Sequence, residues 1–233
     1  MASKTPKNIA IILDGNRRFA KKIGLRPWKG HEYGIKRLHN LIDWCLKLGI
    51  KELTLYSFST ENFKRTKKEK DFLFGLFKRE FRRMKEEEGA LNKDVRINVI
   101  GNVGMFPDDI KNAMLEVVEK TKSHKGLVVN FALGYGGRQE ITDAVKKIAK
   151  DVQKGRIMPE RINEGLIAQN LYLKNEPDLI IRPGGEIRTS NFLTWQSAYS
   201  EWFFTKKLWP EFTKEDLIGC IKEFNNRERR FGK

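Results

Sequence analysis

The sequence has only two cysteines and three histidines. Cys45 and Cys220 lie far apart in apolar helical patterns, so we expect buried, reduced thiols and no disulfide framework. The longest apolar run near the N-terminus, residues 9–13, is too short for a signal peptide or a membrane span. These absences predict a cytoplasmic protein that does not cross the bilayer by itself.

Linkers, internal repeats and low-complexity tracts are also missing from the 233 residues. Hydrophobic residues make up 39% of the chain and aromatic residues 11%, which argues against disorder. A chain of this length can bury one substantial core. We therefore predict a single domain over residues 1–233.

Acidic residues are outnumbered: 30 Asp and Glu stand against 46 Lys and Arg, giving a net charge of +16. The basic residues are spread along the chain and are not gathered in one tail. A well-solvated surface would explain them, and so would an anionic small substrate, an anionic membrane surface or nucleic acid. Composition alone does not distinguish among these explanations of the positive charge.

Strand-like and helix-like segments alternate along most of the chain. Residues 8–13 form an apolar run typical of a buried parallel strand, and residues 31–48 have a helical apolar period. This alternation predicts an α/β fold with a mostly parallel sheet flanked by helices, which binds ligands beyond the carboxyl ends of its strands. The other predicted strands are residues 53–58, 95–100, 127–133 and 179–182, and the other helices are residues 67–88, 107–121, 138–152 and 214–227.

The first polar cluster, residues 14–18 (DGNRR), follows the first predicted strand. Its glycine permits a turn with outward-facing amides, and its two arginines supply fork-shaped donors for phosphate oxygens. Asp14 would repel an anion unless a divalent cation lay between them, which is how Mg²⁺ is usually held. An ordinary strand-to-helix turn with Asp14 as its N-cap is the competing interpretation.

A second cluster, residues 57–65 (SFSTENFKR), follows the strand predicted at residues 53–58. Its hydroxyls and amides could orient a polar ligand, although Ser59 or Thr60 could equally cap a helix. By itself this cluster is a weak signal.

The third cluster follows the last predicted strand. Arg182 and Arg188 flank a Gly-Gly turn ahead of Ser190 and could form a second oxyanion cradle. Structural ion pairs with Glu186 or Asp178 are the alternative for both arginines. Two phosphate cradles on one sheet are less easily dismissed than either alone.

Two single residues add to these clusters. Glu201 stands among aromatic residues, where a carboxylate is costly to bury unless it is paired or binds a metal. His31 could donate to a phosphate at the start of a helix, although a lone histidine is more often a helix-end residue. The other histidines have no metal-ligand neighbours, so we expect no zinc site.

Together these clusters resemble the cis-prenyltransferases, the undecaprenyl or dehydrodolichyl diphosphate synthase family. The match covers nearly the whole chain. The resemblance implies a mostly parallel sheet of about six strands, and Mg²⁺-dependent sequential condensation of isopentenyl diphosphate onto farnesyl or geranylgeranyl diphosphate. The product would be a long-chain Z-polyprenyl diphosphate, the precursor of a glycosyl carrier lipid. The matching stretches are IAIILDGNRRFAKK, GHEYG, LTLYSFSTENFKR, GYGGR and DLIIRPGGEIRTSNFLTWQSAYSEWFFTKKLWPEF.

The resemblance also implies roles by position. Asp14 would be the catalytic acid that works with Mg²⁺, and Glu201 would contribute to the metal site. Asn62 would stand at the reaction centre, but a neutral amide is a poor base, so a diphosphate oxygen or Asp14 is the alternative proton acceptor. The implied substrate-binding residues are Gly15, Asn16, Arg17, Arg18, Phe19 and His31 for the allylic diphosphate, Ser59, Thr60, Glu61, Phe63 and Arg65 at the reaction centre, and Arg182, Arg188, Thr189 and Ser190 for isopentenyl diphosphate.

Some positions bear on the type of enzyme. Arg17 replaces the glycine common in bacterial members, as in archaeal and eukaryotic sequences, and Phe19 and Phe63 stand where tryptophan is frequent. Arg230 and Gly232 resemble the family's C-terminal R-x-G, which reaches the partner subunit's isopentenyl diphosphate site. A self-sufficient homodimer is therefore implied.

A growing isoprenoid needs an apolar tunnel. The stripe Leu73, Phe77, Phe81 and Met84 could be its wall or ordinary core, and these interpretations are compatible because a tunnel wall is a core face. The basic surface could also dock peripherally to anionic lipid when a long product is released.

Two other functions compete with chain elongation. A nucleic-acid-binding module would interleave aromatic and basic residues, which this sequence does not do, so we expect no nucleic-acid partner. A nucleotide-dependent phosphotransferase would carry a G-x-x-x-x-G-K-[ST] loop, which is missing.

Overall fold

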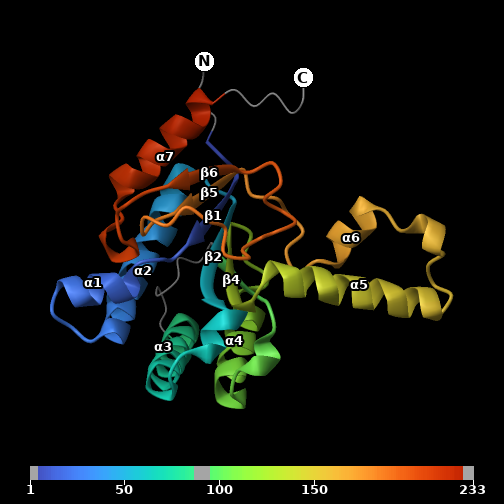
Figure 1. The fold of residues 1–233 in the computed structure, drawn as a ribbon, viewed down its shortest axis with the longest axis horizontal. Helices are drawn as coiled ribbons and strands as arrows, with labels where there is room; N and C mark the ends of the chain where they lie inside the picture. The colour runs from blue at the N-terminus through green and yellow to red at the C-terminus, as the bar shows by residue number, and fades with distance from the viewer. Residues whose placement is uncertain (1–4, 87–94, 228–233) are drawn as a thin grey trace.

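The computed structural model describes residues 5–86 and 95–227. Within them a six-stranded sheet runs through the centre in the order β3-β4-β2-β1-β5-β6, and every neighbouring pair is parallel (Figure 1). The predicted α/β fold is confirmed, and the sheet is parallel throughout. The strands are β1 (Asn8–Ile12), β2 (Glu52–Ser59), β3 (Val95–Ile100), β4 (Leu127–Tyr135), β5 (Leu179–Arg182) and β6 (Glu201–Phe204).

Alternate strand residues face two different layers, as the period of two requires. Ile9 and Ile11 belong to the larger core, together with side chains from α2, α3, α4 and α7. Ala10 and Ile12 face a smaller core that includes Phe192 from a later loop. Both faces are covered, which explains why the strands are apolar along most of their length. The helices are α1 (Asn16–Lys22), α2 (Gly30–Leu48), α3 (Lys67–Glu86), α4 (Asp108–Thr121), α5 (Gly137–Gln153), α6 (Glu164–Asn170) and α7 (Lys214–Asn226).

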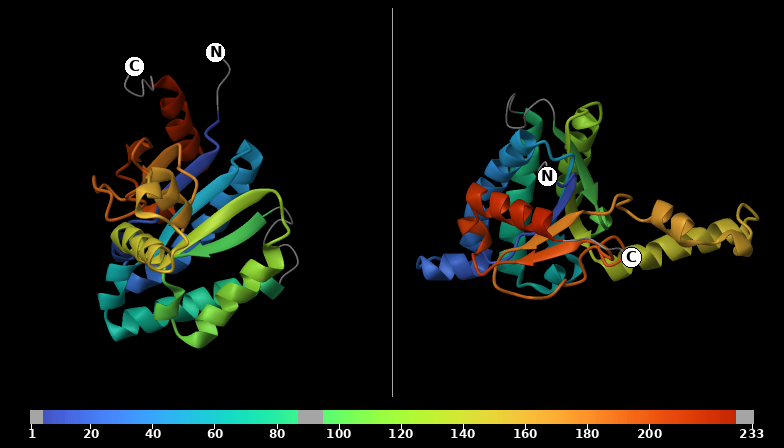
Figure 2. Two further views of the ribbon diagram at one scale, coloured as in Figure 1. Left: turned by 90° about the vertical axis from the view of Figure 1, so that its right-hand side faces the viewer. Right: turned by 90° about the horizontal axis from the view of Figure 1, so that it is seen from above.

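The chain between β4 and β5 extends away from this body. Helix α5 begins just after β4, and α6 packs back against α5, so the pair projects to one side of the sheet (Figure 2). Several large apolar side chains on this projection are exposed, among them Val145, Met158 and Ile162.

Helix α6 and strand β6 are not predicted by the sequence. Helix α6 has seven residues and β6 has four, and neither shows a clear apolar period. The interpretation of Asp14 as an N-cap is wrong, because Gly15 occupies that position and no side chain caps α1. Both cysteines are free; Cys45 is buried, as expected, whereas Cys220 is only partly buried. None of the described helices is long and apolar enough to span a bilayer.

Candidate active site

The loops that follow β1, β2 and β5 meet at one end of the sheet, because these strands are neighbours and run in the same direction. The three polar clusters of the sequence therefore converge, as the position of each after a strand predicted. A cavity at this point, here called the central cavity, is lined by residues from all three loops. Its polar lining includes Asp14, Ser59, Asn62, Arg65, Arg182, Arg188 and Ser190.

Asp14 lies just beyond β1, with its carboxylate held between two arginines. Arg18 Nη2 lies 3.0 Å from Oδ1, and Arg182 Nη2 lies 2.9 Å from Oδ2. The Arg182 side chain is only 4% exposed, whereas that of Asp14 is 27% exposed. The buried arginine fixes the carboxylate, and the exposed part of Asp14 remains accessible from the cavity.

Gly15 turns the chain from β1 into α1. Its φ of +107° is in the left-handed region, and a Cβ at this position would lie 3.0 Å from Leu208. The turn directs the start of α1 toward a second polar cavity, here called the α1 cavity. Because cationic side chains outnumber Asp14 in its lining, this cavity is suited to an anion. The charged and titratable lining residues are Asp14, Arg17, Arg18, Lys21, His31 and Arg65.

Asn16 and His31 each bury a polar atom that has no partner within the described residues. Asn16 Nδ2 donates to the Leu13 carbonyl at 3.0 Å, but its Oδ1 accepts no bond, and His31 Nε2 is likewise unpartnered. Burial, together with the nearby charges of Arg65 and Arg17, lowers the pKa of His31 to about 3. The imidazole is therefore neutral at neutral pH and offers a hydrogen bond without adding charge.

Glu69 on α3 was not singled out from the sequence. Its side chain is 5% exposed, and its Oε1 lies 3.0 Å from Arg65 Nη1 and 3.7 Å from Arg17 Nε. Burial lowers the pKa of Arg65, and the Glu69 carboxylate opposes that effect. Glu69 thus holds two cations side by side at the edge of the α1 cavity.

The loop after β5 is held by Arg182. Its Nη1 donates to the Arg188 carbonyl and, at 2.7 Å, to Ser190 Oγ. Ser190, Asn191 and Leu193 all have positive φ values of 51°, 63° and 45°, which cost free energy in residues other than glycine. Such a loop persists because its surroundings over-determine it, and Arg182 is one of the groups that does so.

An apolar cavity lies between α2 and α3. Leu13, Asn16 and His31 line it and also line both polar cavities, so all three cavities adjoin at these residues. The predicted stripe on α3 forms one wall, joined by Leu76. An amphiphile with an anionic head and a long hydrocarbon tail would fit this arrangement.

A family model described as "Putative undecaprenyl diphosphate synthase" matches residues 12–232. The chain belongs to this prenyltransferase family. It is 46% identical over 230 residues to the tritrans,polycis-undecaprenyl-diphosphate synthase (geranylgeranyl-diphosphate specific) of Thermococcus kodakarensis, covering 98% of this chain and 87% of that protein.

A second relative, the isoprenyl transferase of Thermus thermophilus, is 45% identical over 234 residues, which cover 98% of this chain and 89% of that protein. The crystal structure of lavandulyl diphosphate synthase from Lavandula x intermedia, in complex with dimethylallyl diphosphate, superposes with a TM-score of 0.92 at 34% identity. This match covers 98% of this chain and 99% of that one. The resemblance to cis-prenyltransferases found in the sequence is thereby confirmed.

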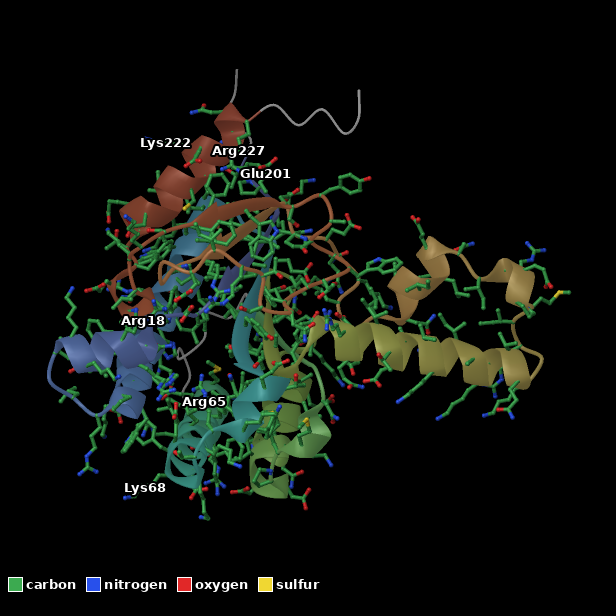
Figure 3. All side chains as sticks on the ribbon, viewed as in Figure 1. Arg18, Arg65, Lys68, Glu201, Lys222 and Arg227 are labelled. Atoms are coloured by element: carbon green, nitrogen blue, oxygen red, sulfur yellow. The ribbon has the colours of Figure 1, made fainter. Side chains whose placement is uncertain are left out.

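Glu201 does not join the site within one chain of this prenyltransferase. It is in register with Leu179, and Leu179 with Ile9, so it lies roughly 16 Å before Asp14 along the strand direction. Glu201 Oε2 instead pairs with Arg227 at 2.6 Å, near α7 and away from Arg18 and Arg65 (Figure 3). The prediction that Asp14 and Glu201 share a metal site therefore does not hold within one chain, because Glu201 is at the amino end of β6.

Two predicted aromatic contacts lie elsewhere. Phe63 packs against Phe58 and Phe106, with ring centroids 4.9 and 5.2 Å apart, and does not line the central cavity. Phe19 packs against Tyr33 at 5.2 Å. Phe63 thus packs behind Phe58, which lines the central cavity, and neither Phe63 nor Phe19 belongs to the lining of the three cavities.

The remaining predicted residues fall into three groups. Glu61 lines the central cavity, and its Oε1 accepts a bond of 3.4 Å from Asn191 Nδ2. Thr60 and Thr189 do not line the central cavity. Arg230 and Gly232 lie outside the described residues.

Proposed function

We propose that this prenyltransferase condenses isopentenyl diphosphate repeatedly onto an allylic diphosphate and yields a long-chain Z-polyprenyl diphosphate, the precursor of a glycosyl carrier lipid. The junction of the three cavities carries this proposal. Two polar cavities match two diphosphates, and the apolar cavity that begins at Leu13, Asn16 and His31 matches a growing hydrocarbon. Because all three meet at one point, the reacting carbons would lie between the two anionic heads.

The α1 cavity would hold the allylic diphosphate. Arg17, Arg18 and Arg65 would take up the charge that develops on this diphosphate as its bond to C1 breaks. His31, being neutral, would contribute a hydrogen bond at the inner edge. Arg182, Arg188 and Ser190 would orient isopentenyl diphosphate so that its terminal double bond faces C1.

The cofactor would be Mg²⁺. The described residues contain no group of three or more acidic, histidine or cysteine side chains able to hold a metal. Asp14 is nevertheless suitable, since Mg²⁺ commonly binds through one carboxylate together with substrate phosphate oxygens and waters. Bound there, the ion would supply Lewis-acid stabilisation of the departing diphosphate.

The final proton is better assigned to a diphosphate oxygen than to Asn62. Asn62 Oδ1 already accepts a bond of 3.1 Å from the Ser59 amide, which completes a capping box in the loop after β2. A neutral amide with its oxygen occupied is a poor base. Asn62 would therefore shape the central cavity, and the isopentenyl diphosphate, already at the reacting carbons, would accept the proton.

Incubation with labelled isopentenyl diphosphate, Mg²⁺ and one primer at a time tests the proposed function. Geranylgeranyl and farnesyl diphosphate are the primers to compare, and the relative named as geranylgeranyl-diphosphate specific favours the first. A ladder of Z-products is expected. Well-folded protein that elongates neither primer would exclude this function.

Glu69→Gln should weaken primer binding, because it removes the charge that holds Arg17 and Arg65 together. We expect KM for the primer to rise about tenfold while kcat changes less. Steady-state kinetics with varied primer measure the effect. Asp71→Asn, an exposed carboxylate on the same helix, is the matched control and should leave KM unchanged. Equal effects of the two substitutions would contradict the role of Glu69.

A homodimer is the proposed assembly. The projecting α5–α6 pair exposes several large apolar side chains, among them Val145, Met158 and Ile162, and a second protein surface that covered them would remove apolar area from water. Sedimentation velocity should therefore give twice the mass of one chain. A monomer that is fully active would exclude the dimer.

Peripheral contact with anionic membrane is proposed for α3. Lys78, Arg79 and Arg82 line its outer side, while its inner side lines the apolar cavity, so a docked enzyme would have its product close to the bilayer. Arg82→Glu should lower co-sedimentation with anionic vesicles about tenfold. Lys222→Glu on α7, far from α3 (Figure 3), is the control. Equal binding to neutral and anionic vesicles would contradict this contact.

A further inference from the structure

Among the described residues, one charged side chain lines the apolar cavity between α2 and α3. Glu80 on α3 stands among leucine, phenylalanine and methionine side chains, and His31, which also lines the cavity, is neutral. The Glu80 side chain is 12% exposed. A carboxylate in such surroundings is costly unless it is paired, so its partners decide what it does.

Glu80 is held by groups on both helices. Its Oε2 lies 3.2 Å from His39 Nε2 on α2 and 3.6 Å from Arg83 Nε, one turn further along α3. Arg83 Nη2 also lies 3.3 Å from His39 Nδ1, the ring nitrogen that can accept a hydrogen bond while Nε2 donates to Glu80. Burial alone would raise the pKa of Glu80, but the hydrogen bond with His39 and the charge of Arg83 hold it below its ordinary value. The Glu80 cluster, formed by His39, Glu80 and Arg83, thus ties α2 to α3 with an ionised carboxylate.

The Glu80 cluster lies well away from the diphosphate cavities. His39 is eight positions after His31, about 12 Å along α2, and Glu80 is eleven positions after Glu69, about 16 Å along α3. Both helices run outward from the polar cavities. Of the α3 side chains that line the cavity, Phe81 and Met84 follow Glu80. A hydrocarbon that grows inward from the α1 cavity therefore reaches the Glu80 cluster before the cavity ends.

We propose that the Glu80 cluster limits the length of the polyprenyl product. Hydrocarbon cannot replace the hydrogen bonds of the carboxylate, so a tail that passes must either bury Glu80 more deeply or separate it from His39. Both are unfavourable, and the penalty appears at one particular chain length. Each further condensation then competes less well with release of the product. This inference rests on the proposed elongation activity, and it identifies the residues that set the length of the product.

Product analysis of Glu80→Leu tests the limit. Leucine keeps most of the bulk and removes the charge, so the most abundant product should lengthen by about one isoprene unit or more. Glu80→Gln keeps the shape and a hydrogen bond, and it should shift the product ladder less in the same direction. Glu86→Leu, at an exposed position on the same helix, is the matched control and should give the parent ladder.

The outcomes separate this inference from the proposed function. If the parent enzyme does not elongate isopentenyl diphosphate, the proposed function fails and this inference fails with it. If the parent elongates and a folded Glu80→Leu enzyme gives the same or a shorter ladder, only the length limit is overturned. If Glu80→Leu does not fold, the ladder of Glu80→Gln decides, and an unchanged ladder again overturns the limit.

Discussion

Asp14→Ala is expected to lower kcat by roughly a thousandfold or more, because it removes the proposed Mg²⁺ ligand at the point where the two polar cavities meet. No other carboxylate lines both cavities among the described residues. Turnover at saturating primer and isopentenyl diphosphate, measured with a titration of Mg²⁺, gives the effect. Raising the Mg²⁺ concentration should recover little of the lost rate.

The alanine variant also leaves Arg182, which is 4% exposed, without a charged partner. That loss alone could destabilise the protein by a few kcal/mol. Asp14→Asn is therefore the better variant for kinetics, since its amide oxygen can still accept a bond from Arg182. Thermal unfolding of both variants separates stability from catalysis. If Asp14→Asn folds normally and keeps more than about a tenth of the parent kcat, Asp14 is not the catalytic carboxylate.

The position of the site could be predicted from the sequence because α/β sheets impose it. Asp14, Ser59 and Arg182 lie 45 or more residues apart along the chain, yet each stands at or directly after the end of an apolar strand. Parallel strands place such ends on one edge of the sheet, so the convergence required no knowledge of side-chain contacts. The glycine at position 15 likewise predicted the tight turn between β1 and α1.

Other placements depend on strand register and local packing, which residue types alone do not show. The resemblance implied a metal role for Glu201, but its register with Leu179 places it, within one chain, at the opposite end of the sheet from Asp14. Glu69 stands four residues before Leu73, on the same face of α3 as the predicted apolar stripe, and this spacing is the signal that could have placed it inside, beside Arg65. Phe63 was expected at the substrate and is instead part of an aromatic cluster with Phe58.

Arg182→Lys is expected to raise KM for isopentenyl diphosphate about 10- to 100-fold while leaving KM for the primer nearly unchanged. One guanidinium contacts Asp14, the Arg188 carbonyl and Ser190 Oγ at once, and it does so from a buried position. Lysine keeps the positive charge but cannot reach these acceptors in the same fixed fork geometry. The loop with positive φ at Ser190 would lose the group that holds it.

Arg188→Lys is the matched control for Arg182→Lys. Arg188 lines the same central cavity, but its side chain is 60% exposed and its ion pair is with Glu186, so lysine can replace it at a smaller cost. The two variants carry the same charge. They differ in the contacts that are lost, because the parent Arg182 holds Asp14 and the loop after β5, whereas the parent Arg188 pairs with Glu186. If they raise KM for isopentenyl diphosphate equally, the charge alone matters and the fork geometry of Arg182 does not. A much larger effect at Arg182, with KM for the primer unchanged, would assign the loop after β5 to isopentenyl diphosphate and leave the α1 cavity to the primer.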